Sequence, residues 1–327
     1  MYCESYLFSL FVSLFHCFMK IYIKTPLIGR RKAIPHMLEH CIAKSHFWSS
    51  DFFTFTYGSE VEISSNFTLY EYDKWVSIDP ILKYLTDPIS KEAFEYELPI
   101  IQEECEDSSY DQRIYQESLT LLLKKKFDLN SASGLSREAV KKYHEKYYQL
   151  ENFLICDDTL SEYKLLFQGE KLKKLRTWVT TPLQVFPFLF EGDAYFIYWK
   201  QYCLQEDYWK LFFLQTLLEG YIFYQKRWQW REYYHGTPYF FTYQEANWLV
   251  VPDYDFSNYS QDFFLQGKQY LLSMLKAWYF STVLFLNNYF YWIPATRQEV
   301  IALCESFSWN YFQKEVLTPL NEMKKGA

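Results

Sequence analysis

The sequence predicts an α+β protein of two similar lobes, and three observations lead to this prediction. The chain has 327 residues, more than a single hydrophobic core usually organises. Half of its residues are hydrophobic and 22% are charged, so the chain can bury enough apolar surface to fold. The order of strands and helices expected in the first half recurs in the second half, although the residues themselves do not visibly repeat.

The first lobe is expected to open with a buried strand. Residues 6–24 form an apolar run almost long enough to cross a bilayer. No basic segment precedes the run, and His16 and Cys17 interrupt it, so a strand is the better interpretation and no membrane span is expected. A membrane anchor is the alternative for this segment.

The rest of the first lobe shows helical and strand patterns in turn. Pro35 suits the first turn of a helix, because its missing N–H would have no partner there. Pro99 should kink or interrupt a later helix, and Ser136 is suited to be an N-cap. The expected elements are a helix over 33–45, two strands within 52–77, helices over 80–85, 90–126 and 138–148, and a strand over 152–156.

A change of composition separates the lobes. Basic residues gather within 162–176, ahead of an apolar, strand-like run. We therefore expect a first lobe over 1–163, a linker over 164–177 and a second lobe over 178–327. The elements expected in the second lobe are a strand over 182–199, a helix over 207–226, a strand pair over 239–251, a helix over 260–278 and a final helix from 297.

Charge and cysteine content narrow the class of protein. The formal net charge of −7 disfavours nucleic acid and anionic lipid as partners. The seven cysteines are odd in number and form no CxxC pair, which suits a reducing compartment, so a cytoplasmic location is expected. Aromatic residues make up 22% of the chain; we interpret most of them as core, with a partner interface as the alternative.

The first candidate motif for a catalytic metal site is the string HMLEH on a predicted helix. The spacing of four places His36 and His40 on one helix face, where both imidazoles could bind a single Zn²⁺. Glu39 stands beside them, in a position to accept a proton from a metal-bound water. The order H-x-x-E-H is that of the inverted zincins. The alternative is a polar helix face with unligated histidines.

A catalytic zinc usually has three protein ligands, so a third is needed. Glu97 and Glu104 lie seven residues apart, which places them on the same face of the helix expected there. Glu104 could complete a His2Glu site, and Glu97 could orient a ligand or a water. A solvated acidic face is the alternative interpretation.

Three blocks in this order, HMLEH, then ELPIIQEECED, then SREAVKKYHEKYYQLENFLIC, resemble the pitrilysin/insulinase family of zinc peptidases. The resemblance implies that each lobe is a mostly antiparallel mixed sheet with helices packed on one face. It also implies that His36 and His40 bind zinc, that Glu39 is the general base, that Glu104 is the third ligand and that Glu97 supports the site.

Two further assignments follow from the resemblance. On spacing alone Glu117 rivals Glu104 as the third ligand, but Glu104 matches the family in its helical context and in its Glu97 partner. In the second lobe, Arg231 and Tyr239 match a family segment that contributes to the substrate pocket. A cation and a phenol near the scissile carbonyl would stabilise a developing oxyanion. A surface arginine and a core tyrosine are the alternative interpretation of this pair.

The predicted function is a zinc-dependent endopeptidase, a hydrolase that acts on peptides or unfolded segments. The substrate would add as an extended strand along an edge strand within 60–72. Because related peptidases close a chamber from more lobes than this chain has, the resemblance implies a homodimer or a heterodimer with a related subunit. The alternative function is a non-catalytic partner subunit of a heterodimeric peptidase that supplies a substrate-binding wall.

Overall fold

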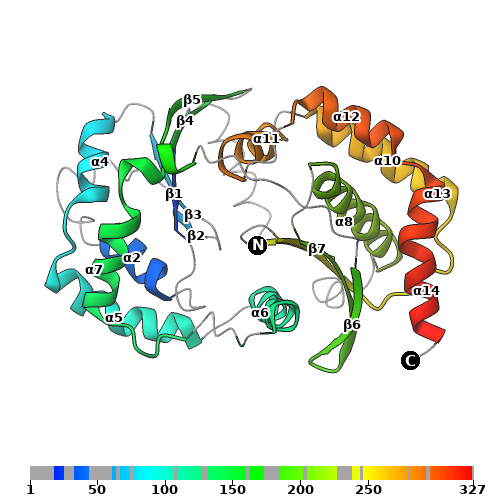
Figure 1. Cartoon of the computed structure of the whole chain (residues 1–327), viewed down its shortest axis with the longest axis horizontal. Helices are drawn as coiled ribbons and strands as arrows, with labels where there is room; N and C mark the ends of the chain where they lie inside the picture. The colour runs from blue at the N-terminus through cyan, green and yellow to red at the C-terminus, as the bar shows by residue number, and fades with distance from the viewer. Residues whose placement is uncertain are drawn as a thin grey trace, which may run out of the picture. The chain divides into compact units, whose positions relative to one another are not determined.

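The computed structural model describes residues 18–25, 33–43, 61–63, 67–73, 77–106, 110–124, 126, 131–159, 162–172, 184–201, 205–226, 238–243, 246–277, 280–291 and 295–325 (Figure 1). The chain forms two compact units. The first consists of Met1–Ser108 and Phe127–Leu175, and the second of Ser109–Lys126 and Arg176–Ala327. Each unit combines an antiparallel sheet with helices, which confirms the prediction of an α+β protein of two similar lobes.

The sheet of the first unit has five strands in the order β2-β3-β1-β4-β5, and every described pair is antiparallel. The central strand, β1, confirms the expected buried strand over its described part, whereas residues 6–17 lie outside the described residues. Within the described ranges, no helix has the length and apolar character that a bilayer crossing requires. The strands are β1 (Phe18–Lys24), β2 (Val61–Ile63), β3 (Phe67–Asp73), β4 (Phe153–Thr159) and β5 (Glu162–Gln168).

The helices of the first unit cover one face of this sheet (Figure 1). Met19, Ile21 and Ile23 alternate along β1, and all three join one hydrophobic core with buried side chains of the helices. The expected N-cap is confirmed, since the Ser136 hydroxyl accepts a hydrogen bond from the Ala139 N–H. The helices are α2 (Ala33–Ala43), α4 (Ile78–Thr86), α5 (Lys91–Glu106) and α7 (Arg137–Tyr147).

The single helix expected over 90–126 is wrong, because this stretch forms two helices. Pro99 lies inside α5 without ending it, and α5 ends at Glu106. The second helix, α6 (Tyr110–Leu123), belongs to the second unit. Its spacing of apolar residues continues that of α5, so periodicity alone does not reveal that the two helices pack against different sheets.

The expected linker also begins too early. Strand β5 and the short 3-10 helix η2 (Glu170–Leu172) occupy part of the segment 164–177, and the first unit extends to Leu175. Among the described strands, β5 is an edge strand that pairs with β4. Its exposed Lys164 and Leu166 resemble the composition of a connector, which explains the error.

Close backbone packing beside β5 predicts an effect on stability. The Gly169 N–H donates to the Phe153 carbonyl at 2.8 Å. A Cβ at this position would overlap the backbone of Leu150 and Glu151. Replacing Gly169 with alanine is therefore expected to lower the free energy of unfolding by about 1–3 kcal/mol in chemical denaturation. The control is Gly220→Ala, since a Cβ there meets nothing within 4 Å; equal stability of the two variants would contradict the prediction.

A buried histidine makes the first unit sensitive to acid. The His144 side chain on α7 is buried, and its Nε2 donates to the Leu85 carbonyl at 2.8 Å, near the end of α4. Burial lowers the pKa of His144 below its usual value. The unfolded chain therefore binds a proton more readily, and stability is lost as pH falls below the ordinary histidine pKa of about 6.5. The test compares the melting temperatures of metal-free wild type and metal-free His144→Gln as the pH is lowered. Below about pH 6.5, the melting temperature of wild type should fall more steeply. If the melting temperatures of the two proteins fall in parallel, the prediction is wrong.

The second unit repeats this plan with a sheet in the order β6-β7-β9-β8, again with antiparallel pairs. Its strands are β6 (Gln184–Phe190), β7 (Asp193–Gln201), β8 (Tyr239–Tyr243) and β9 (Ala246–Pro252). Its other helical elements are α8 (Gln205–Lys226), α10 (Gln261–Lys276), α11 (Phe280–Leu286), η3 (Asn287–Tyr291), α12 (Arg297–Ser306), α13 (Trp309–Phe312), η4 (Gln313–Leu317) and α14 (Thr318–Lys325). Most of the described aromatic residues of this unit pack in one core, in agreement with the interpretation of the aromatic content.

Candidate metal centre

Helix α2 presents the HMLEH string next to the core of the first unit. Met37 and Leu38 are fully buried among the side chains that pack on the sheet, which fixes the rotation of the helix about its axis. His36 and His40, four residues apart, therefore share a face, and their ring centroids lie 4.8 Å apart with the planes at 89°. Glu39 is adjacent, and one of its carboxylate oxygens lies 3.6 Å from His40 Nε2.

These three side chains form a compact set of possible donors. One ligand atom from each of His36, Glu39 and His40 can be chosen so that all three lie within 4.8 Å of one another. The side chains of Glu39 and His40 are only 11% and 8% exposed, whereas that of His36 is 24% exposed. The cluster is thus shielded by the protein and opens toward His36.

Helix α5 brings Glu104 to the same place. Glu104 Oε2 lies 3.2 Å from His36 Nε2 and 3.4 Å from His40 Nε2. A tetrahedral zinc with bonds of about 2.0–2.1 Å requires ligand atoms about 3.3–3.5 Å apart. One of the two distances falls within this range and the other is slightly shorter, so these three side chains could hold a metal as a His2Glu set.

Glu97 supports His40 from the opposite side of the ring. Its Oε2 lies 2.9 Å from His40 Nδ1, and the Glu97 residue is only 4% exposed. If Nδ1 donates to this carboxylate, Nε2 is left available to a metal. This contact suits the orienting role expected for Glu97, which stays a prediction.

A buried pair of tyrosines near Glu39 was not anticipated from the sequence. The hydroxyls of Tyr70 on β3 and Tyr148 after α7 lie 2.9 Å apart, and both residues are buried. Burial raises the pKa of both phenols, and the charge of Glu39 raises them further, so both stay protonated. Tyr148 belongs to a block that resembles the peptidase family, but no pattern in the sequence connects it with Tyr70 or Glu39.

The remaining candidates are Glu117, Tyr239 and Arg231. Glu117 is an exposed residue of α6, which is part of the second unit, whereas Glu104 is the acid that the first unit itself brings to the histidines. Tyr239 begins β8 at the edge of the second sheet, and its ring lies nearly parallel to that of Phe241. Arg231 lies outside the described residues. The pairing of Arg231 with Tyr239 therefore stays a prediction.

Comparisons with known proteins bear on the fold. No protein-family model matches the chain, and no curated protein matches it in sequence. Among solved structures, the chain is similar to the ferredoxin protease FusC, solved as a mutant in complex with Arabidopsis ferredoxin, with a TM-score of 0.51 and 9% identity. This match covers 93% of the chain but only 44% of FusC, so the chain spans less than half of that structure.

A second similar structure is a predicted insulinase family protease from Yersinia pestis, with a TM-score of 0.47 and 11% identity over 94% of this chain and 85% of that one. The likeness to FusC concerns the fold alone at this level of identity. It shows that the chain shares the fold of FusC.

Proposed function

We propose that this chain is a zinc-dependent endopeptidase that hydrolyses peptides or unfolded segments. The observation that carries the proposal is the position of Glu104 Oε2, at 3.2 and 3.4 Å from the Nε2 atoms of His36 and His40. These distances suit three ligands of one tetrahedral zinc, with the Glu39 carboxylate beside them. The peptidase-like fold supports the same reaction class.

Each side chain has a distinct task in this proposal. His36, His40 and Glu104 would bind the metal, and Glu97 keeps the proton of His40 on Nδ1. Zinc, when bound, supplies a Lewis acid for hydrolysis. The Glu39 carboxylate accepts a proton from the attacking water and returns it to the leaving amine. Because Glu39 is largely buried, competing water is excluded around it, which strengthens its electrostatic interactions.

The substrate would bind as an added strand. Strand β2 is an edge of the first sheet, and it lies within the segment 60–72 expected for this role. Main-chain hydrogen bonds along such an edge bind any extended peptide, so sequence selectivity should be modest and folded proteins should be poor substrates. Arg231 and Tyr239 are proposed to stabilise the developing oxyanion.

The proposed assembly is a homodimer or a heterodimer with a related subunit. The chain spans less than half of the ferredoxin protease whose fold it shares, and in this proposal a second copy or a related chain adds further lobes. The same observation favours the second candidate function, a non-catalytic subunit that lends a substrate-binding wall to a catalytic partner. A cytoplasmic location is proposed from the cysteine pattern, and Cys41, Cys156 and Cys304 are free thiols.

Zinc analysis combined with a peptide assay tests the proposal. Purified wild-type chain should contain about one zinc per chain and should cleave an unstructured fluorogenic peptide, alone or with its partner. A chelator should abolish cleavage, and zinc should restore it. A chain that binds no zinc contradicts the peptidase proposal and supports the non-catalytic subunit.

A further inference from the structure

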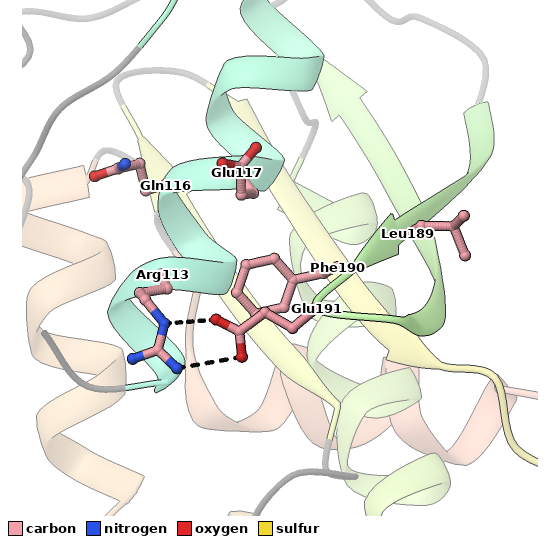
Figure 2. A pocket seen from close by; sticks show the side chains of 6 residues that line it. All are labelled: Arg113, Gln116, Glu117, Leu189, Phe190 and Glu191. Carbon is pink, nitrogen blue, oxygen red and sulfur yellow. Dashed lines mark hydrogen bonds and ion pairs between the residues drawn. The ribbon is translucent and has the colours of Figure 1, made fainter.

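The second unit contains a pocket of about 380 Å³ between α6 and the turn that joins β6 to β7 (Figure 2). The Arg113 guanidinium faces the Glu191 carboxylate there, with Nε donating at 2.8 Å and Nη2 at 3.3 Å. These two side chains are 41% and 44% exposed, so water screens the ion pair and it contributes little energy. The first unit offers a stronger candidate, because its hydroxyl groups near Glu39 are buried.

A chain of hydroxyl groups runs through the core of the first unit. The hydroxyls of Tyr70 and Tyr148 lie 2.9 Å apart, and those of Thr25 and Thr68 lie 2.9 Å apart. A hydrogen bond from Thr68 to the Tyr148 phenol links the two pairs, and it opposes the rise that burial causes in the pKa of Tyr148. All four residues are at most 1% exposed. Water therefore does not compete for these hydrogen bonds, and each of them counts for more than it would at the surface.

The two tyrosines form the end of this chain that lies near Glu39. The tyrosines pack in the same hydrophobic core as helix α2, and the Glu39 side chain on that helix is only 11% exposed. The charge of Glu39 helps to raise the pKa of both Tyr70 and Tyr148. At the other end of the chain, Tyr143 contacts Thr25, and its pKa is raised by burial and by neighbouring tyrosines instead.

The hydrogen bonds of the chain have a preferred direction. Each hydroxyl has a single proton to donate. When Thr68 donates to Tyr148, the proton of Tyr148 is left for Tyr70, and Thr25 donates to Thr68. In this order the positive end of each O–H dipole points toward the tyrosine end of the chain. A nearby carboxylate favours this order, because hydroxyl dipoles orient in the field of the protein.

We propose that the pair of Tyr70 and Tyr148 positions the Glu39 carboxylate beside the metal ligands and keeps it from joining them. A buried carboxylate is costly unless dipoles compensate its charge, and the two hydroxyls supply such dipoles from the core side. Without them, the carboxylate would turn toward the histidines, where one of its oxygens already lies 3.6 Å from His40 Nε2. This inference rests on the proposed peptidase function and adds two positioning residues, which act through Glu39.

Removing one hydroxyl tests the inference. Tyr70→Phe keeps the ring, and its kcat on an unstructured fluorogenic peptide is expected to fall at least about tenfold, as is typical when a supporting partner is lost. KM and zinc affinity should stay at the wild-type values, because the three proposed ligands are untouched. The matched control is Tyr198→Phe, which removes an equally buried hydroxyl of the second unit that donates to the Val316 carbonyl at 3.1 Å. This control should leave kcat unchanged. Circular dichroism and thermal unfolding confirm that both variants fold.

Two further comparisons separate positioning from loss of packing. In a Glu39→Gln background, Tyr70→Phe should have no further effect on the residual rate, because the carboxylate that it positions is already gone. Thr68→Ser keeps the linking hydroxyl and should keep kcat, whereas Thr68→Val loses that hydroxyl and should lower kcat.

Several outcomes would overturn the positioning role while leaving the proposed function intact. They are an unchanged kcat for Tyr70→Phe, a loss of zinc affinity parallel to that of kcat, and an equal loss of rate in the Glu39→Gln background. A wild-type chain without zinc would instead overturn the proposed function, and the positioning role of Tyr70 and Tyr148 with it.

Discussion

Replacing Glu39 with glutamine is expected to lower the rate of peptide hydrolysis by about 100- to 10,000-fold, the range that general acid–base groups contribute. Glutamine keeps the size of the side chain but cannot accept the proton of the attacking water. Glu39 is not among the three proposed ligands, so zinc content should stay at that of wild type. The measurement is initial cleavage of an unstructured fluorogenic peptide, paired with metal analysis of the same preparation.

The control for this experiment is Glu92→Gln, a conservative change at an exposed position in the first turn of α5. It should leave both zinc content and cleavage unaltered. Full cleavage by the Glu39 variant would show that another group is the base. If the Glu39 variant loses both zinc and cleavage activity, Glu39 is itself a ligand. This outcome is a real alternative because a Glu39 carboxylate oxygen lies 3.6 Å from His40 Nε2.

Replacing Glu104 with glutamine is expected to weaken zinc binding by more than about 100-fold. Loss of an orienting partner such as Glu97 typically costs about 10- to 100-fold, and loss of a direct ligand should cost more. Glu104→Gln removes the negative charge that lies 3.2 and 3.4 Å from the two imidazole nitrogens. Chelator competition on purified protein measures the affinity of each variant, including Glu97→Gln.

Two control variants test whether the loss of zinc affinity is specific to Glu104. Glu103→Gln changes an exposed neighbour in the same turn and should not alter zinc affinity. Glu117→Gln tests the rival third ligand and should likewise have no effect, because Glu117 lies on α6 in the second unit. If Glu117→Gln weakens binding and Glu104→Gln does not, the ligand assignment is wrong.

Much of the first unit could be predicted because its signals are local. The spacing of His36 and His40 places them on one face of any helix, and the structure has them side by side on α2. Glu97 and Glu104 share a helix face for the same reason. Glu104 contacts His36, and Glu97 contacts His40. The N-cap at Ser136 is also a local feature, set by one side chain and a backbone N–H three residues later.

The errors concern relations between distant segments. The pattern over 90–126 is helical throughout, yet α6 packs with Trp248, which is 130 residues away from Ser118 along the chain. The exposed side chains of β5 look like those of a connector, although the strand pairs with β4. The tyrosine pair near Glu39 joins residues 78 positions apart, and neither residue lies in a pattern that indicates contact.

The sequence by itself therefore predicted a His2Glu donor set with an adjacent carboxylate, and it determined the α+β fold class with two similar lobes. Helical periodicity and residue type suffice for this, because they act over a few neighbouring residues. Only the tertiary structure decided that Glu104 lies beside both histidines, that Glu97 contacts His40 Nδ1, and that α6 belongs to the second unit. These arrangements depend on how helices pack against sheets across long sequence separations, which local patterns do not encode.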